Sequence, residues 1–285
     1  MHDPNRVEAW PPVLAEAQVE RYLGRIGLAA KPAPTLAGLT ALQRAHMQAV
    51  PFENLDVYLR RPLRLGVGDL FAKIVGRRRG GYCFELNTLY AALLRGLGFA
   101  EVTPVLARVW LRDPPKPPTR NHLAQHVRLG GGRYLTDVGF GGLTARVPVP
   151  LDGDDGAPLD DGEGRVRLRR DARWGRMLER ELDGAWQPQY SFDATAVARQ
   201  DALAANHFME THPASHFREN LACARFTERG RRGLWNGQLT ERVGPVAGEA
   251  QPVAAADLLA TLRGRFGVEL GELTEAERTR LGLPT

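Results

Sequence analysis

The chain has 285 residues, of which 43% are hydrophobic and 25% are charged. This is the composition of an ordinary globular protein, and it excludes a disordered or collagen-like chain. At roughly 150 residues per domain, the length predicts two domains, or one large body with an appendage. A chain of this length buries a core that needs neither disulfides nor a structural metal for stability.

The formal net charge is +5, from 38 Lys and Arg against 33 Asp and Glu. The arginines are scattered along the chain, with dense clusters only at 77–79 and 165–170. A scattered excess indicates a solvated surface, so we expect no nucleic-acid partner. No apolar run approaches the roughly 18 residues of a membrane-spanning helix, and residues 1–6 do not begin a signal peptide. We therefore expect a cytoplasmic protein with no membrane partner.

Hydrophobic spacing predicts helices in the first hundred residues. Apolar side chains recur at helical spacing over 14–26, 39–47, 70–75 and 83–94. Gly27, Pro51 and Gly96 are the expected helix stops.

The period changes to two after residue 100. Residues 102–110 alternate, and the runs 123–129 and 134–138 flank three glycines, which predicts a hairpin. The acidic, glycine-rich stretch 151–163 is expected to be a surface loop. Strand-like runs follow, including 218–226, before helical patterns return at 258–266 and 274–278. Helices, then strands, then mixed structure predict an α+β fold.

The chain has two cysteines, Cys83 and Cys223, which we expect to be reduced thiols rather than a disulfide or a zinc site. The alternating run around Cys223 predicts a small buried hydrophobe. Cys83 instead follows a Gly80–Gly81 turn and begins an apolar helix. A free thiol is only a few per cent ionised at neutral pH, whereas a helix N-terminus and a neighbouring imidazolium favour the thiolate. Cys83 is therefore the predicted nucleophile.

A cysteine nucleophile needs a histidine, and that histidine needs an orienting acceptor. His122 and His126 lie on the strand that the glycine turn folds back towards Asp137. Four residues apart on a strand, both point to the same face, so spacing leaves both as candidates. Asp137 lies among apolar residues, where a carboxylate needs a partner such as histidine.

The segment RGGYCFELN at 79–87 resembles the cysteine motif of the arylamine N-acetyltransferases. Four further segments resemble that family in the same order, namely YLGRIGL at 22–28, VPFENLD at 50–56, DVGFGG at 137–142 and THPASHF at 211–217. The run 258–270 is also similar. The resemblance thus extends from about residue 19 to residue 280.

The family has a Cys-His-Asp triad, whose cysteine matches Cys83 and whose aspartate matches Asp137. Its histidine opens a strand about 15 residues before the aspartate, which selects His122 over His126. The resemblance also implies a three-part architecture. It consists of an N-terminal helical bundle (1–99), a central β-barrel (100–203) and a C-terminal α/β lid (204–285).

The reaction implied is a ping-pong transfer from acetyl-CoA to an aromatic amine or hydrazine through acetyl-Cys83. Acetyl-CoA is then a substrate, and no bound cofactor or metal is expected. Backbone N–H groups of Cys83, of a neighbour of His122 or of the 139–142 turn are candidates for stabilising the oxyanion. A monomer and a homodimer both remain open.

Substrate-binding candidates also follow from the resemblance. Phe52, Phe140 and Phe217 are candidates for an aromatic wall around the arylamine, with core packing as the alternative. Thr211 and Ser215 lie in the segment that borders the coenzyme A groove in the family, and a plain turn is the alternative there.

Other motif residues receive no catalytic role. Glu53 and Glu85 are expected to be structural acids. His207, His212 and His216 have no assigned function, and their spacing resembles a metal site only loosely.

Two other functions remain open. A Cys-His-Asp triad also serves thiol hydrolases, transglutaminase-like enzymes and amide synthases that close macrolactams. A non-catalytic binding protein with a decayed site is the third possibility, and the intact Cys83, His122 and Asp137 argue against it.

Overall fold

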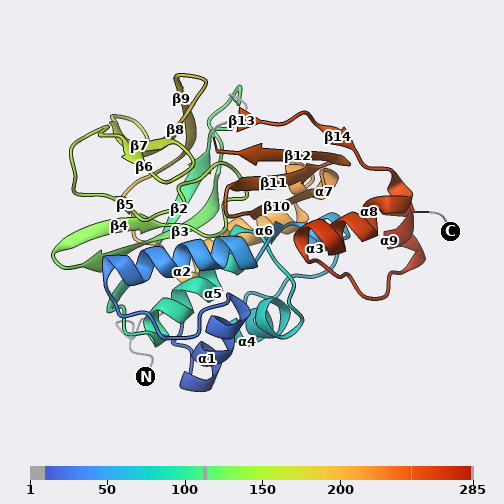
Figure 1. Cartoon of the computed structure of the whole chain (residues 1–285), viewed down its shortest axis with the longest axis horizontal. Coiled ribbons are helices and arrows are strands. Elements are labelled where there is room, and N and C mark those ends of the chain that lie inside the picture. Colours follow the sequence, from blue (N-terminus) through green and yellow to red (C-terminus); the bar gives the residue numbers. More distant parts are fainter. Residues whose placement is uncertain (1–9, 112–113, 245, 284–285) are drawn as a thin grey trace.

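The structure, a computed structural model, describes residues 10–111, 114–244 and 246–283. Residues 1–6, in which no signal peptide is expected, lie outside the described residues. Figure 1 shows a cluster of helices from the first hundred residues beneath two sheets, with the green and yellow sheet on the left and the orange and red sheet on the right.

The N-terminal part is helical, as predicted. Its helices are α1 (Glu16–Arg25), α2 (Leu36–Ala49), α3 (Leu55–Tyr58), α4 (Val67–Phe71), the π-helical turn η1 (Ala72–Gly76) and α5 (Cys83–Gly96). Thr35 caps α2, because its hydroxyl accepts a 3.2 Å hydrogen bond from the Gly38 N–H. Helix α5 is the centre of this bundle, since every residue from 83 to 94 is buried.

The middle of the chain forms an eight-stranded antiparallel sheet. Its strands are β2 (Glu101–Val109), β3 (Arg120–Leu129), β4 (Gly132–Thr136), β5 (Val149–Pro150), β6 (Leu159–Asp160), β7 (Arg165–Asp171), β8 (Gly175–Leu182) and β9 (Ala185–Phe192). Their order is β5-β4-β3-β2-β9-β8-β7-β6, and β5 also contacts β7, so the sheet is nearly closed. The predicted hairpin is the β3–β4 pair, whose turn residues Gly130 and Gly131 have φ of 55° and 86°.

The last part of the chain builds a second antiparallel sheet with flanking helices. The elements are α6 (Arg199–Thr211), α7 (His216–Glu219), β10 (Ala222–Phe226), β11 (Gly230–Trp235), β12 (Gln238–Val243), β13 (Val246–Ala247), β14 (Gln251–Pro252), η2 (Ala255–Asp257), α8 (Leu258–Thr261), η3 (Leu262–Phe266) and α9 (Glu275–Arg280). Strand β1 (Phe52–Glu53) comes from the helical part and pairs with β10. The edge of this sheet therefore lies beside the loop that leads to Cys83.

The α+β class is confirmed, and two local predictions need correction. The pattern over 218–226 predicts one strand, but its first residues belong to α7 and the strand begins at Ala222. The stretch 151–163 is not wholly a surface loop, because Asp161 and Glu163 are buried. Asp161 pairs with Arg180 on β8, and Glu163 pairs with Arg146 in the segment before β5 at 2.5 Å, so buried ion pairs hold this loop in place.

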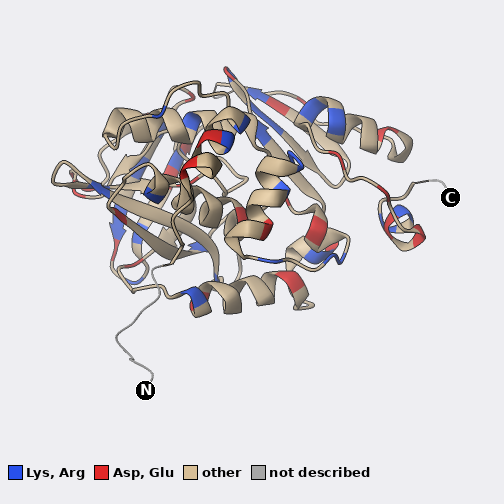
Figure 2. Cartoon of the chain, turned by 90° about the horizontal axis from the view of Figure 1, so that it is seen from below, with Lys and Arg blue, Asp and Glu red and all other residues tan. Residues whose placement is uncertain are grey.

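Basic and acidic residues are interspersed along the helices and strands in view in Figure 2. Within the described ranges, no helix combines the length and the apolar character needed to cross a bilayer.

Candidate active site

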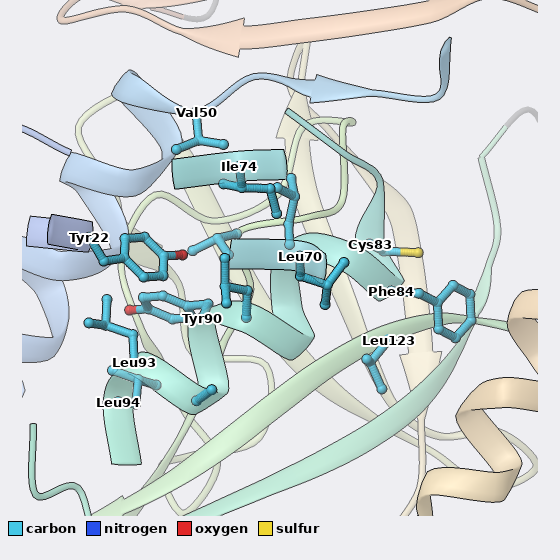
Figure 3. Packing of buried hydrophobic residues seen from close by; sticks show 14 of the residues in the cluster. Tyr22, Val50, Leu70, Ile74, Cys83, Phe84, Tyr90, Leu93, Leu94 and Leu123 are labelled. Carbon is cyan, nitrogen blue, oxygen red and sulfur yellow. The ribbon is translucent and has the colours of Figure 1, made fainter. Parts of the chain in front are cut away.

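Cys83 is the first residue of α5, and the turn before it is held by close backbone contacts. A Cβ atom on Gly80 would lie 2.1 Å from the carbonyl oxygen of Pro51, so only glycine fits there. The Glu85 carboxylate accepts a 3.2 Å hydrogen bond from the Tyr82 N–H, which is half of a capping box. Figure 3 shows the Cys83 sulfur pointing away from Tyr22 and Tyr90, towards the side on which the Phe84 ring lies.

His122 and Asp137 form a buried pair beside this cysteine. The Nε2 atom of His122 lies 2.8 Å from Oδ2 of Asp137, which leaves Nδ1 for the Cys83 thiol. Burial lowers the pKa of His122, but Asp137 and a hydrogen bond with Cys83 outweigh burial and raise it to about 10. Burial alone would raise the pKa of Asp137, yet His122 holds it below its ordinary value. The imidazole thus lies between the Cys83 sulfur and the Asp137 carboxylate, and both favour its protonated form.

His126 has a different environment from His122. It pairs across the ladder with Thr103 and Leu135, farther along β3, whereas His122 lies opposite Ala107. Burial and Arg133 lower the pKa of His126. The structure therefore places His122, and not His126, against Asp137.

Asn87 links all the parts of this arrangement, although the sequence pattern assigned it no role. Its Nδ2 donates to the Leu123 carbonyl at 2.6 Å and to Asp137 Oδ1 at 2.8 Å, and its Oδ1 accepts from the Val138 N–H at 3.0 Å. The available signal was its position four residues after Cys83, which places both on one helix face.

Aromatic rings enclose the imidazole. The Tyr190 and Phe140 rings lie 4.9 Å and 5.1 Å from the His122 ring. Tyr190 comes from β9, far from the other motifs, so no local sequence signal pointed to it. Gly139 packs directly on Cys83, and its N–H donates to Asp137 Oδ1 at 2.8 Å. That N–H is therefore occupied, which removes Gly139 from the oxyanion candidates.

A buried ionic network lies next to the Gly80–Gly81 turn that precedes Cys83. Arg79 pairs with Glu53 at 2.8 Å and with Asp56 at 3.1 Å, and Lys73 pairs with Asp56 at 2.6 Å and with Glu85 at 2.7 Å. The expectation that Glu53 and Glu85 are structural acids agrees with these contacts.

Cys83 and His122 open into a cavity of about 1380 Å³. The predicted aromatic residues Phe52, Phe140 and Phe217 all line it. Its other walls come from β2, from the β8–β9 hairpin and from the C-terminal sheet. This volume exceeds the roughly 300–1,000 Å³ of usual small-molecule sites.

Thr211 and Ser215 are placed differently from the aromatic residues. The Ser215 hydroxyl is buried and donates to the Met209 carbonyl at 2.6 Å, and the Thr211 hydroxyl donates to the His207 carbonyl at 2.7 Å. Neither is among the described residues that line the cavity.

The three C-terminal histidines do not converge. His212 stacks on Phe208 with ring centroids 4.4 Å apart, and His216 packs on Phe217. In the part of the chain that the structure describes, no group of three or more His, Cys, Asp or Glu side chains could hold a metal ion.

Comparison with known proteins identifies the family. The family model described as N-acetyltransferase matches residues 35–274. An arylamine N-acetyltransferase of Mycolicibacterium smegmatis is 39% identical over 88% of this chain and 92% of its own length. The solved arylamine N-acetyltransferase of Salmonella typhimurium superimposes with a TM-score of 0.86 at 32% identity, over 94% of this chain and 98% of that one. The Mycobacterium marinum enzyme, solved in complex with CoA, also gives 0.86 at 33% identity, over 92% and 98% of the two chains. This chain belongs to the arylamine N-acetyltransferase family.

Proposed function

We propose that this protein transfers an acetyl group from acetyl-CoA to the nitrogen of an aromatic amine or hydrazine, with Cys83, His122 and Asp137 as its catalytic residues. The observation that carries the proposal is the buried series of contacts from Cys83 through His122 to Asp137, open to the cavity at its first two members. Membership in the family and the CoA complex of the M. marinum relative support the choice of donor.

In the first half-reaction the Cys83 thiolate attacks the carbonyl carbon of the thioester. The tetrahedral intermediate collapses by breaking the carbon–sulfur bond to coenzyme A, and the His122 imidazolium donates its proton to the departing thiolate. Acetyl-Cys83 and free coenzyme A result. Asp137 holds the Nε2 side of the ring, so that Nδ1 faces the sulfur throughout.

In the second half-reaction the amine nitrogen attacks the acetyl carbonyl of acetyl-Cys83. Neutral His122 accepts the proton that the amine loses, and the Cys83 thiolate leaves, which restores the starting ion pair. The ionic form of the site is thus regenerated without any other proton carrier.

The cavity supports binding of the two substrates in turn. The aromatic side chains of Phe52, Phe140 and Phe217 form an apolar wall next to Cys83, suited to an arylamine ring. We assign Thr211 and Ser215 to the turn itself, because their hydroxyl groups already donate to backbone carbonyls. In this scheme the bundle (1–99) supplies the nucleophile, the central sheet region (100–203) supplies His122 and Asp137, and residues 204–285 cover the cavity.

Intact-protein mass spectrometry tests the proposal directly. The protein is incubated briefly with acetyl-CoA without an acceptor, and we expect a mass gain of one acetyl group, which an arylamine then discharges. Cys83→Ser should abolish the adduct. The matched control is Cys223→Ala, which removes the other cysteine and should keep it. A folded protein that gains no acetyl group, or gains one that an arylamine does not discharge, would refute the proposed reaction.

A further inference from the structure

Arg231 is a cationic side chain in the wall of the active-site cavity that the proposed reaction does not use. It lies on β11, and Arg231, Gly233 and Trp235 alternate along the face that lines the cavity. Across the ladder, Gly233 faces Ala224 on β10. Nη1 of Arg231 lies 3.7 Å from where a Cβ on Gly233 would be, so the guanidinium extends along the strand over Gly233, and both residues line the cavity.

The guanidinium has few partners of its own. Its Nη2 donates to the Gly141 carbonyl, while its Nε is buried without a hydrogen-bond partner. Among the described residues Arg231 forms no ion pair, and nearby Glu163 is already bound to Arg146 at 2.5 Å. Burial lowers the pKa of Arg231 to about 10, which reflects the cost of this uncompensated charge.

A buried cation without a counter-ion is unfavourable unless a ligand supplies the charge. The planar fork of arginine matches a carboxylate, to which it donates two parallel hydrogen bonds. The acetyl group of the donor carries no charge that needs such a partner. The buried guanidinium of Arg231 therefore points to a substrate that bears an additional anionic group.

The guanidinium of Arg231 lies close to the aromatic wall of the cavity. A Cβ on Gly141 would lie 2.6 Å from the Phe52 ring, so Gly141 packs against the aromatic wall. Arg231 is bonded to the carbonyl of the same glycine. The guanidinium thus lies next to the aromatic wall, where a substituent on a ring bound by that wall would reach.

We propose that Arg231 binds a carboxylate carried by the substrate and so selects acidic substrates over neutral ones. The carboxylate sits on the ring of the acceptor, as in an aminobenzoate, or on an acidic acyl group of the donor. The proposal rests on the proposed acetyl transfer, and the experiment distinguishes failure of the role of Arg231 from failure of the acetyl transfer itself.

The test compares two acceptors that differ in charge but hardly in shape, 4-aminobenzoate and 4-aminobenzamide, with acetyl-CoA as donor. For Arg231→Met we expect kcat/KM for 4-aminobenzoate, divided by kcat/KM for 4-aminobenzamide, to fall about tenfold or more. Both acceptors report on the same preparation, so the ratio does not depend on how much of the variant is folded. Arg231→Lys keeps the charge without the fork and should give an intermediate ratio.

Arg232→Met is the matched control. Arg232 is the next residue on β11, lies outside the cavity lining and pairs with Glu241 at 2.8 Å. This variant should keep the wild-type ratio.

A second comparison tests whether the carboxylate belongs to the acyl group of the donor and not to the acceptor. Malonyl-CoA and acetyl-CoA are compared as donors to a neutral arylamine, 4-anisidine. Selective loss of the reaction with malonyl-CoA in Arg231→Met would support the proposal and would show that Arg231 binds the carboxylate of the acyl group. Unchanged ratios in both comparisons would overturn the proposal. An equal rise in KM for both donors would also overturn it, because it would indicate that Arg231 binds a phosphate of coenzyme A. Failure of the wild-type protein to acetylate 4-anisidine at all would instead refute the proposed function.

Discussion

The Nδ2 atom of Asn87 donates a 2.8 Å hydrogen bond to Oδ1 of Asp137, which ties the helix that begins at Cys83 to the loop that carries the carboxylate. The same amide reaches the backbone of Leu123, next to His122, at 2.6 Å. One side chain therefore positions all three proposed catalytic residues relative to one another.

Asn87→Ala should lower kcat about 100-fold, because it removes the group that holds Asp137 and His122 in register with Cys83. It should also lower the free energy of unfolding by about 3 kcal/mol, since three buried polar groups lose a partner. Steady-state kinetics and urea denaturation measure the two effects. Thr88→Val is the control, because the Thr88 hydroxyl is buried without a partner, and its removal should change neither quantity appreciably. Wild-type kcat in Asn87→Ala would show that Asp137 is held by other contacts.

The two strand histidines should differ in their effect on thiol reactivity. Iodoacetamide alkylates the thiolate, so His122→Gln should slow the alkylation of Cys83 near pH 7 by about tenfold or more. His126→Gln should leave the rate unchanged, because His126 does not contact Asp137 or Cys83. Peptide mapping distinguishes alkylation of Cys83 from alkylation of Cys223, since both are free cysteines. The opposite pattern would assign the catalytic role to His126.

Gly139 leaves no room for a side chain beside the nucleophile. A Cβ there would lie 2.8 Å from the Cys83 Cα and 2.9 Å from Asn87 Nδ2. Gly139→Ala should therefore displace the helix start and reduce kcat/KM about 100-fold, as judged by steady-state kinetics. Gly264→Ala is the control, since nothing lies within 4 Å of its Cβ, and it should retain activity and gain up to about 1 kcal/mol of stability. Full activity in Gly139→Ala would show that the contact relaxes without moving Cys83.

His46 should make the bundle sensitive to acid. It is buried on α2 with Nδ1 2.8 Å from the Tyr22 hydroxyl, and burial and Arg25 lower its pKa to about 3. An unfolded histidine has a pKa of about 6.5. Between these values the unfolded chain binds the extra proton, so the stability is lost as the pH falls below about 6.5, at up to about 1.4 kcal/mol per pH unit.

His46→Gln removes this titration, and the slope of unfolding free energy against pH should become shallower by about that amount. Urea denaturation at several pH values between about 5 and 7 measures the slope. The exposed His207 supplies the control, because His207→Gln should keep the wild-type slope. Identical slopes in all three proteins would show that His46 does not contribute to acid sensitivity.

Much of the fold could be predicted from local patterns. The apolar spacing over 83–94 predicts α5, and Gly-Gly-Gly between two alternating runs predicts the β3–β4 hairpin. The strand predicted over 218–226 is wrong for its first residues, because α7 extends to Glu219 and β10 begins only at Ala222. Asp161 and Glu163 were expected in solvent, since a local acidic pattern does not show that Arg180 and Arg146 approach from elsewhere.

By itself the sequence determined that Cys83 begins a helix after a glycine turn, that Asp137 needs a partner, and which family the motifs resemble. It could not separate His122 from His126 on geometric grounds, because both share one face of a strand. The family resemblance selected His122, and the tertiary structure supplied the geometric reason, since four residues span roughly 13 Å along a strand and His122 is the one that meets Asp137. Only the tertiary structure singled out Asn87, Tyr190 and Arg231. Their roles depend on sheet register and on the packing of elements distant in the chain, and a shift of one residue would turn each strand side chain to the opposite face.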